Sequence, residues 1–68
     1  ENEINKKRLL KAISELKESD IQLIEMRFFE QRAFKEMGEI LAITENNAKV
    51  KTFRALDKLK QLFNQNNR

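Results

Sequence analysis

Four polar side chains, those of Glu45, Asn46, Asn47 and Lys49, follow Thr44 in the second half of the chain. They offer a carboxylate, two amides and an ammonium group, which together donate and accept many hydrogen bonds. Side chains of these types can bond to the edges of bases when they occupy the first turn of a helix lying in a DNA groove. Their types and spacing favour a binding surface over a catalytic centre.

The composition gives little support for catalysis or metal binding. The 68 residues include no cysteine, histidine, tyrosine or tryptophan, which excludes a disulfide framework and a zinc site of cysteine and histidine. Carboxylates and lysines remain, but no pair of them stands in the recognisable apolar setting that a general acid or base requires. We expect no enzyme activity, no cofactor and no bound metal.

Basic residues are concentrated toward the C-terminus. Residues 44–68 hold six Lys or Arg against two Asp or Glu, a balance of +4, whereas residues 1–43 hold eight against nine, a balance of −1. A basic excess on one segment is typical of proteins that bind a polyanion. No apolar stretch approaches the ~20 residues of a membrane span, so we expect a cytoplasmic protein without membrane insertion. The abrupt start at a glutamate suggests a fragment of a longer protein.

The apolar pattern predicts an all-α fold. Proline is absent, Gly38 is the only glycine, and apolar residues recur at spacings of three and four rather than in alternation. We expect one four-helix domain over residues 1–68, without a wing. Its helices are expected at about 3–17, 20–29, 33–41 and 45–63. Ser19 and Thr44 are the expected N-caps of the second and fourth helices.

The second predicted helix, over residues 20–29, is more apolar than a single buried stripe requires. We expect its Phe28 and Phe29 to lie in the core, together with Phe34 of the next helix. The apolar surplus still leaves room for an exposed patch that binds another protein.

Residues 34–50 fit a helix-turn-helix. This motif needs a small residue where its helices cross, apolar residues around a tight turn, and a polar first turn on the second helix. Gly38 provides the close approach and residues 42–44 the tight turn. The small shared core is expected to consist of Met37, Leu41, Ile43 and Ala48. A short helix, a turn and a longer helix can also arise by chance in any small helical bundle.

Four segments resemble region 4 of bacterial sigma factors of the sigma-70 family, in particular the extracytoplasmic-function group. They read Met-Arg-Phe-Phe at 26–29, Phe-Lys-Glu-Met-Gly-Glu-Ile-Leu at 34–41, Ile-Thr-Glu-Asn-Asn-Ala-Lys-Val-Lys at 43–51, and Arg-Ala at 54–55 followed by Leu59. The family usually has alanine in place of Gly38 and glycine in place of Ala42, so Ala42 predicts either a negative φ or mild strain. Residues 46–48 replace the usual Gly-Thr-Val, and Leu56 replaces a commonly basic residue.

The resemblance implies that the fourth helix enters the major groove of the −35 element of double-stranded promoter DNA. It also implies that the first two helices brace the fourth and contact the β-flap of core RNA polymerase, with an anti-sigma factor as a further candidate partner. Polar side chains can discriminate bases and apolar ones can touch thymine methyls. The expected base-reading residues are Glu45, Asn46, Asn47, Lys49, Val50 and Phe53. Phosphate contacts, which set register, are expected from the free N–H groups near Ala33 and Phe34 and from Arg27, Lys35, Thr44, Lys51, Arg54 and Lys58.

Several of these assignments have competing explanations. Lys58 can belong to an ordinary solvated face, and Glu45 can serve only the helix dipole. Arg54 can pair with Asp57 or Glu39 instead of a phosphate. For the function as a whole, one alternative is a helical protein-interaction module that binds an anti-sigma factor or a polymerase subunit. The other is a helix-turn-helix output domain of the response-regulator type.

Overall fold

The computed structural model describes residues 2–65 as helices joined by short turns. The elements are α1 (Asn2–Ser14), α2 (Glu18–Ile24), a single π-helical turn η1 (Glu25–Phe29), α3 (Phe34–Leu41) and α4 (Glu45–Gln65). No strand occurs among these residues, which confirms the predicted all-α fold. The remaining ends of the predicted domain, residues 1 and 66–68, lie outside the described part of the chain.

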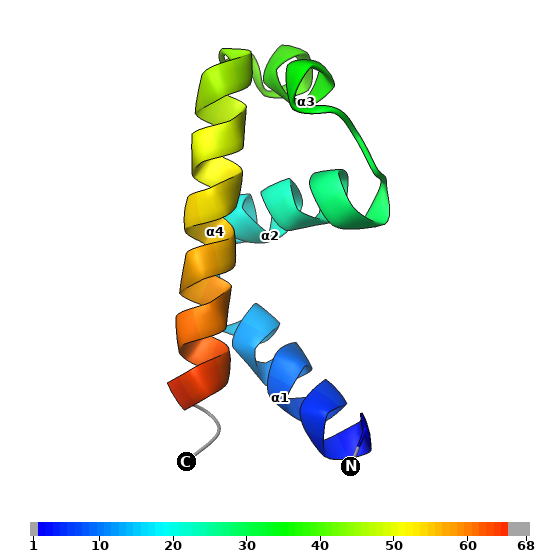
Figure 1. Cartoon of the computed structure of the whole chain (residues 1–68), viewed down its shortest axis with the longest axis vertical. Helices are drawn as coiled ribbons and strands as arrows, with labels where there is room; N and C mark the ends of the chain where they lie inside the picture. The colour runs from blue at the N-terminus through cyan, green and yellow to red at the C-terminus, as the bar shows by residue number, and fades with distance from the viewer. Residues whose placement is uncertain (1, 66–68) are drawn as a thin grey trace.

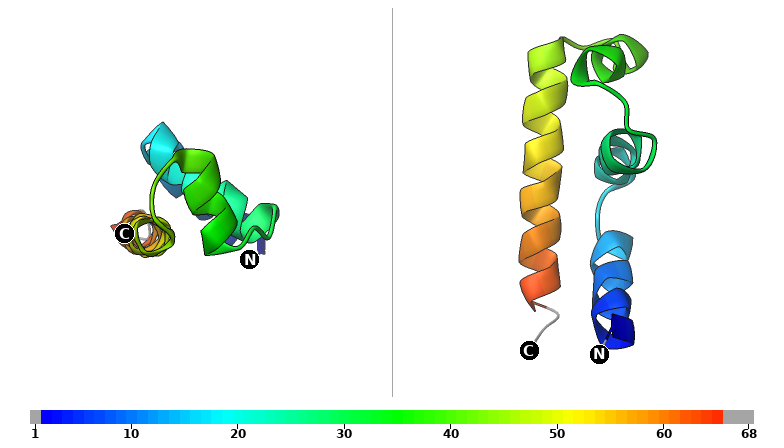
Figure 2. Two further views of the ribbon diagram at one scale, coloured as in Figure 1. Left: turned by 90° about the horizontal axis from the view of Figure 1, so that it is seen from above. Right: turned by 45° about the vertical axis from the view of Figure 1, so that its right-hand side comes forward.

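The long helix α4 organises the molecule. Its 21 residues give it a length of roughly 30 Å, and α1, α2 and α3 each pack against it. The three shorter helices are stacked along one side of α4, with α3 beside its first turns, α2 near its middle and α1 beside its C-terminal half (Figures 1 and 2). Each part of α4 therefore has a different neighbour.

Two apolar clusters hold α2, η1, α3 and the turn after α1 against α4. The first consists of buried Leu23, Met26, Met37 and Ala48, with Phe34, Leu41 and Ile43 packed around them. The second consists of buried Leu16, Ile24 and Ala55, with Ile21, Leu56, Leu59 and Leu62 around them. Thr52 lies between the clusters, fully buried, and its hydroxyl donates to the carbonyl of Ala48 at 2.7 Å. The small residues of α4 allow close approach of the shorter helices.

The boundary between α1 and α2 differs from the prediction. After Ser14, the N–H groups of Glu15 and Leu16 donate to carbonyls three residues back, at 3.2 and 3.1 Å, which tightens the chain and ends the helix before residue 17. Lys17 then occupies the N-cap position of α2, and no side chain caps the helix. Ser19 was wrongly predicted as the cap, because α2 starts at Glu18 and places Ser19 inside its first turn.

The predicted burial of two phenylalanines is also wrong. Phe28 is 49% exposed and Phe29 is 74% exposed. Both belong to η1, whose wider turn changes the helical phase after α2 and leaves Met26 as its buried residue. Gln31 then adopts a left-handed conformation with φ 55°, which directs the chain back toward α4. Phe34, half-buried at the start of α3, packs on the core in their place.

Candidate nucleic-acid interface

A tight turn fixes α3 and α4 relative to each other. Ala42 is left-handed, with φ 59° and ψ 41°. The N–H of Ile43 donates to the carbonyl of Gly38 at 2.9 Å, and the N–H of Ala42 donates to that of Glu39 at 3.4 Å. This pair of bonds is a Schellman C-cap, which usually has glycine at the left-handed position. Of the two expectations for Ala42, the strained positive φ is the one observed.

Gly38 lies directly against this turn. A Cβ built on Gly38 would stand 2.8 Å from the carbonyl oxygen of Ile43, 3.1 Å from the carbonyl carbon of Thr44 and 3.2 Å from the nitrogen of Glu45. All three atoms belong to the backbone, so no side-chain movement could relieve the contact. The predicted close approach at Gly38 is confirmed.

Thr44 begins the second helix of the motif. Its Oγ1 accepts a hydrogen bond from the N–H of Asn47 at 3.0 Å, which confirms the predicted N-cap of α4. Ala48, the first buried residue of α4, packs with Met37, Leu41 and Ile43, as predicted for the small core of the motif. The start of α4 is therefore held by a cap and a core contact while its first polar residues stay exposed.

The predicted base-reading residues lie mostly on one exposed face of α4. At 3.6 residues per turn, positions 46, 49, 50 and 53 fall within an arc of about 100° that turns away from the buried positions 48 and 55, and position 45 adjoins this arc on the side of buried Thr52. Of these, Glu45, Asn46 and Lys49 are exposed and Val50 is half-buried. Phe53 is 53% exposed, so about half of an aromatic side chain lies open on this face. We call positions 45, 46, 49, 50 and 53 the base-reading face.

A stripe of cations adjoins the base-reading face. Positions 47, 51, 54 and 58 follow one another at spacings of four, three and four, so Asn47, Lys51, Arg54 and Lys58 share one side of α4, all exposed. Arg54 pairs with neither Asp57 nor Glu39 in the described part of the chain. The Lys58 ammonium lies 4.0 Å from the carboxylate of Asp20, a weak and exposed pair.

The start of α3 presents uncapped backbone donors. Ala33 is the N-cap residue, with φ −72° and ψ 151°, and no side chain caps the helix. Lys35 in its first turn is exposed. Nearby, Arg32 pairs with Glu30 at 2.6 Å and with Glu36 at 3.1 Å. The hydrogen bond to Glu30 is the main cause that raises the pKa of Arg32 above its ordinary value.

Arg27 and two phenylalanines form contacts that the sequence did not signal. The guanidinium of Arg27 lies over the ring of Phe34, 4.3 Å from its centroid, and donates to the carbonyl of Arg32 at 3.0 Å. The rings of Phe34 and Phe53 lie 6.0 Å apart between centroids. These residues come from η1, α3 and α4, so no periodicity within one helix reveals the arrangement.

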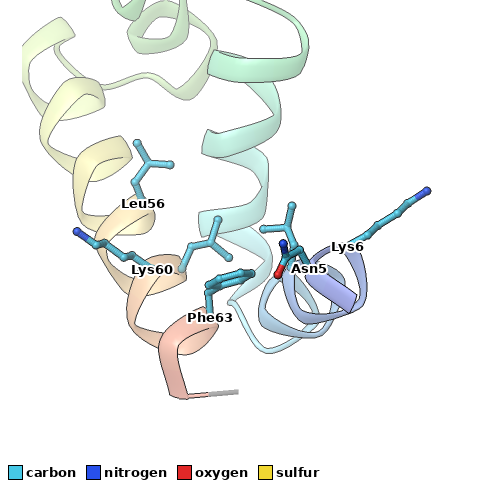
Figure 3. A pocket seen from close by; sticks show the side chains of 7 residues that line it. Asn5, Lys6, Leu56, Lys60 and Phe63 are labelled. Carbon is cyan, nitrogen blue, oxygen red and sulfur yellow. The ribbon is translucent and has the colours of Figure 1, made fainter. Parts of the chain in front are cut away.

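A separate apolar groove lies between α1 and the C-terminal half of α4. Its floor is formed by Leu9, Leu56, Leu59 and Phe63, with Asn5, Lys6 and Lys60 around them (Figure 3). The groove has a volume of about 660 Å³. The groove could not be predicted from the sequence, because it depends on how α1 packs against α4. The consecutive leucines Leu9 and Leu10 on one short helix were nevertheless a signal of exposed apolar surface.

No group of three or more acidic, cysteine or histidine side chains is arranged to hold a metal ion within residues 2–65. None of the helices in this range combines the length and apolar character needed to cross a membrane.

The family model described as "Sigma-70, region 4" matches residues 12–61. The matched segment runs from the last turn of α1 into the C-terminal half of α4, and it includes the complete helix-turn-helix. Comparisons with curated proteins and with solved structures gave no match.

Proposed function

Because this chain belongs to the region 4 family of sigma-70 factors, we propose that it recognises the −35 element of promoters for RNA polymerase, as part of an extracytoplasmic-function sigma factor. In this role α4 enters the major groove and α3 lies across the DNA backbone. The observation that carries the proposal is the exposed base-reading face of α4 beside a cationic stripe. As a partner of RNA polymerase, the protein would act in the cytoplasm.

The side chains of the base-reading face suit different bases. Asn46 can form a bidentate pair with adenine, Lys49 can donate to guanine, and Glu45 can accept from the amino group of cytosine. Val50 and Phe53 can touch thymine methyls. Asn47 lies in line with the cations of the stripe at the start of α4, where its amide can reach a base or a phosphate.

Phosphate contacts would come from both helices of the motif. Within residues 2–65, Lys51 and Arg54 are exposed and form no ion pair. Lys35 projects from the first turn of α3, and Lys58 can exchange its weak pair with Asp20 for a phosphate. Thr44 and the backbone N–H groups near Ala33 and Phe34 can add neutral donors at the helix starts. Four cationic contacts imply a slope of log affinity against log salt of about −3 to −4.

A salt titration tests this proposal. Fluorescence anisotropy of a labelled promoter duplex, selected by the protein from a random library, should give that slope and a preference over unrelated duplex. The double variant Lys51→Gln, Arg54→Gln should reduce the magnitude of the slope by about 2. The control Lys7→Gln, Lys11→Gln removes the same charge from exposed positions on α1 and should barely change it. Equal effects of the two double variants would contradict the proposed interface.

The groove between α1 and α4 supports a second role in binding protein. We propose that it receives the β-flap of RNA polymerase, or an anti-sigma factor that competes for the same apolar surface. Leu9 lines the groove at 41% exposure, whereas Leu10 beside it is 56% exposed and lies outside the groove. Covering the 41% of Leu9 that is exposed would contribute roughly 0.6–1.2 kcal/mol, so Leu9→Gln should weaken β-flap binding about three- to eightfold. Leu10→Gln is the matched control and should leave it unchanged.

The DNA-reading and protein-binding roles can be separated in one variant. Replacing Asn46, Asn47 and Lys49 together by alanine should abolish promoter binding, because it removes most polar groups of the base-reading face. The groove is distant from these residues along α4, so binding of the β-flap fragment should persist. Unchanged promoter binding in this variant would refute the base-reading role of these residues, and a wild-type protein that binds the β-flap fragment but no duplex would favour a module that binds only protein.

A further inference from the structure

Arg27 uses both the plane and one donor of its guanidinium within the protein. The Cζ atom lies 4.3 Å from the centroid of the Phe34 ring, the geometry of a cation–π contact. The Nη1 group donates to the carbonyl of Arg32 at 3.0 Å, across the turn that joins η1 to α3. The side chain is half-buried. An arginine that reached out to a phosphate would give up both contacts.

Phe34, which contacts Arg27, also contacts Phe53 of α4. Its ring and that of Phe53 are separated by 6.0 Å between centroids, with an interplanar angle of 53°. This separation lies within the range of about 4.5–7 Å in which tilted aromatic rings attract each other. Arg27, Phe34 and Phe53 therefore form a continuous stack that reaches from η1 across α3 to α4.

The outer member of this stack, Phe53, belongs to the base-reading face. It is half exposed, and an exposed phenylalanine without neighbours exchanges between staggered χ1 rotamers. Contact with Phe34 removes part of that freedom. A ring that is already oriented loses less conformational entropy when it meets a base.

We propose that Arg27 is a positioning residue for base recognition, which holds Phe34 and thereby fixes Phe53 in the orientation in which it meets the DNA. The inference rests on the proposed function, because it uses the base-reading role of Phe53. It gives Arg27 a role other than a phosphate contact. Lysine could not replace it, because only a planar guanidinium can lie flat on a ring and donate sideways to a carbonyl.

The test compares Arg27→Lys, Arg27→Gln and Lys35→Gln. Affinity is measured over a salt series for the selected promoter duplex and for an unrelated duplex. Both Arg27 variants should lower the ratio of promoter affinity to unrelated-duplex affinity about fivefold. This is the smallest loss of discrimination expected when one base contact is removed. Affinity for the unrelated duplex and the salt slope should stay near the wild-type values. Lys35→Gln should instead weaken both duplexes alike and reduce the slope by about 0.9.

A second variant separates positioning from general loss of structure. Phe34→Leu keeps an apolar side chain on the core but removes the ring, and should lower the same ratio. Because both residues act through Phe53, the double variant Arg27→Lys, Phe34→Leu should lose no more than Phe34→Leu alone. Thermal melting of each variant checks the fold, and nuclear Overhauser contacts between the Phe34 and Phe53 rings should weaken in Arg27→Lys.

Four results would overturn these assignments. If Arg27→Lys keeps the promoter preference while Arg27→Gln reduces the salt slope as Lys35→Gln does, Arg27 is a phosphate contact. Losses that add in the double variant would also refute the positioning role. A wild-type protein with no preference between the duplexes would refute the proposed function itself, whereas a preference that survives in every Arg27 variant would refute only the role of Arg27.

Discussion

At Gly38 two physical effects oppose each other: the helix propensity of the residue and its close contact with the turn. A single substitution at this position measures which effect is larger. Replacing glycine by alanine inside a helix ordinarily stabilises it, by about 1 kcal/mol. In this protein the added Cβ would meet the backbone of residues 43–45, at 2.8 Å in its closest contact. Gly38→Ala therefore tests whether close packing or helix propensity dominates in α3.

The cost of the clash should slightly exceed the gain from helix propensity. Overpacking that displaces the backbone costs about 1–3 kcal/mol, which exceeds the gain of about 1 kcal/mol from helix propensity. We expect Gly38→Ala to lower the free energy of unfolding by about 1 kcal/mol, or the melting temperature by about 4–8 °C in a domain of this size. The displaced atoms lie at the start of α4, so promoter affinity should fall as well.

Thermal and urea unfolding followed by circular dichroism would measure this effect. Glu39→Ala is a suitable control, because Glu39 is the exposed neighbour in the same helix and the substitution should change stability by no more than about 0.5 kcal/mol. A melting temperature for Gly38→Ala several degrees above that of the wild type would refute the reasoning. It would mean that the turn moves away from α3 at little cost.

Four further substitutions test the turn and the core. Ala42→Gly should stabilise the protein by about 0.5–1 kcal/mol in thermal melts, because the left-handed cost of roughly 1–2 kcal/mol exceeds the chain entropy that glycine adds; destabilisation would argue against the positive φ. Thr44→Ala should cost about 1 kcal/mol in urea unfolding, with an unchanged m-value, through loss of the α4 cap; a neutral result would indicate that the cap bond does not persist. Phe29→Ser should change stability by less than about 0.5 kcal/mol, whereas Leu16→Ala should cost about 2–5 kcal/mol; similar losses would place Phe29 in the core.

The helix-turn-helix could be predicted because its signals are local. The cap at Thr44 acts over three residues, and the close approach at Gly38 involves a turn that begins four residues later. Glycine, threonine and the apolar residues between them have few other reasons to occur at these spacings. The left-handed Ala42 could be stated only as one of two possibilities, because alanine adopts either conformation at different cost.

The exposure of Phe28 and Phe29 could not be predicted in the same way. It depends on the π-helical turn η1 and on the left-handed Gln31. The residues of η1 do not signal a π-helix, and glutamine does not signal a left-handed conformation. The stack of Arg27 on Phe34 spans the same turn, and its second pair joins residues 19 positions apart. Contacts of this kind arise from the packing of η1, α3 and α4 together, which spacing within a single helix does not encode.

The length of α4 would allow a domain of this size to serve the two proposed partners. Its first three turns carry the base-reading face, while Leu56, Leu59 and Phe63 contribute to the groove at its other end. The centres of the two segments are about ten residues apart, or roughly 15 Å along the helix. Substitutions at that separation, without shared neighbours, usually have additive effects. We therefore expect the losses from Asn46→Ala and Leu9→Gln to add in the free energy of promoter binding by polymerase that carries this domain. A coupled effect would mean that occupancy of the groove alters the base-reading face, and α4 is the element through which such coupling would have to pass.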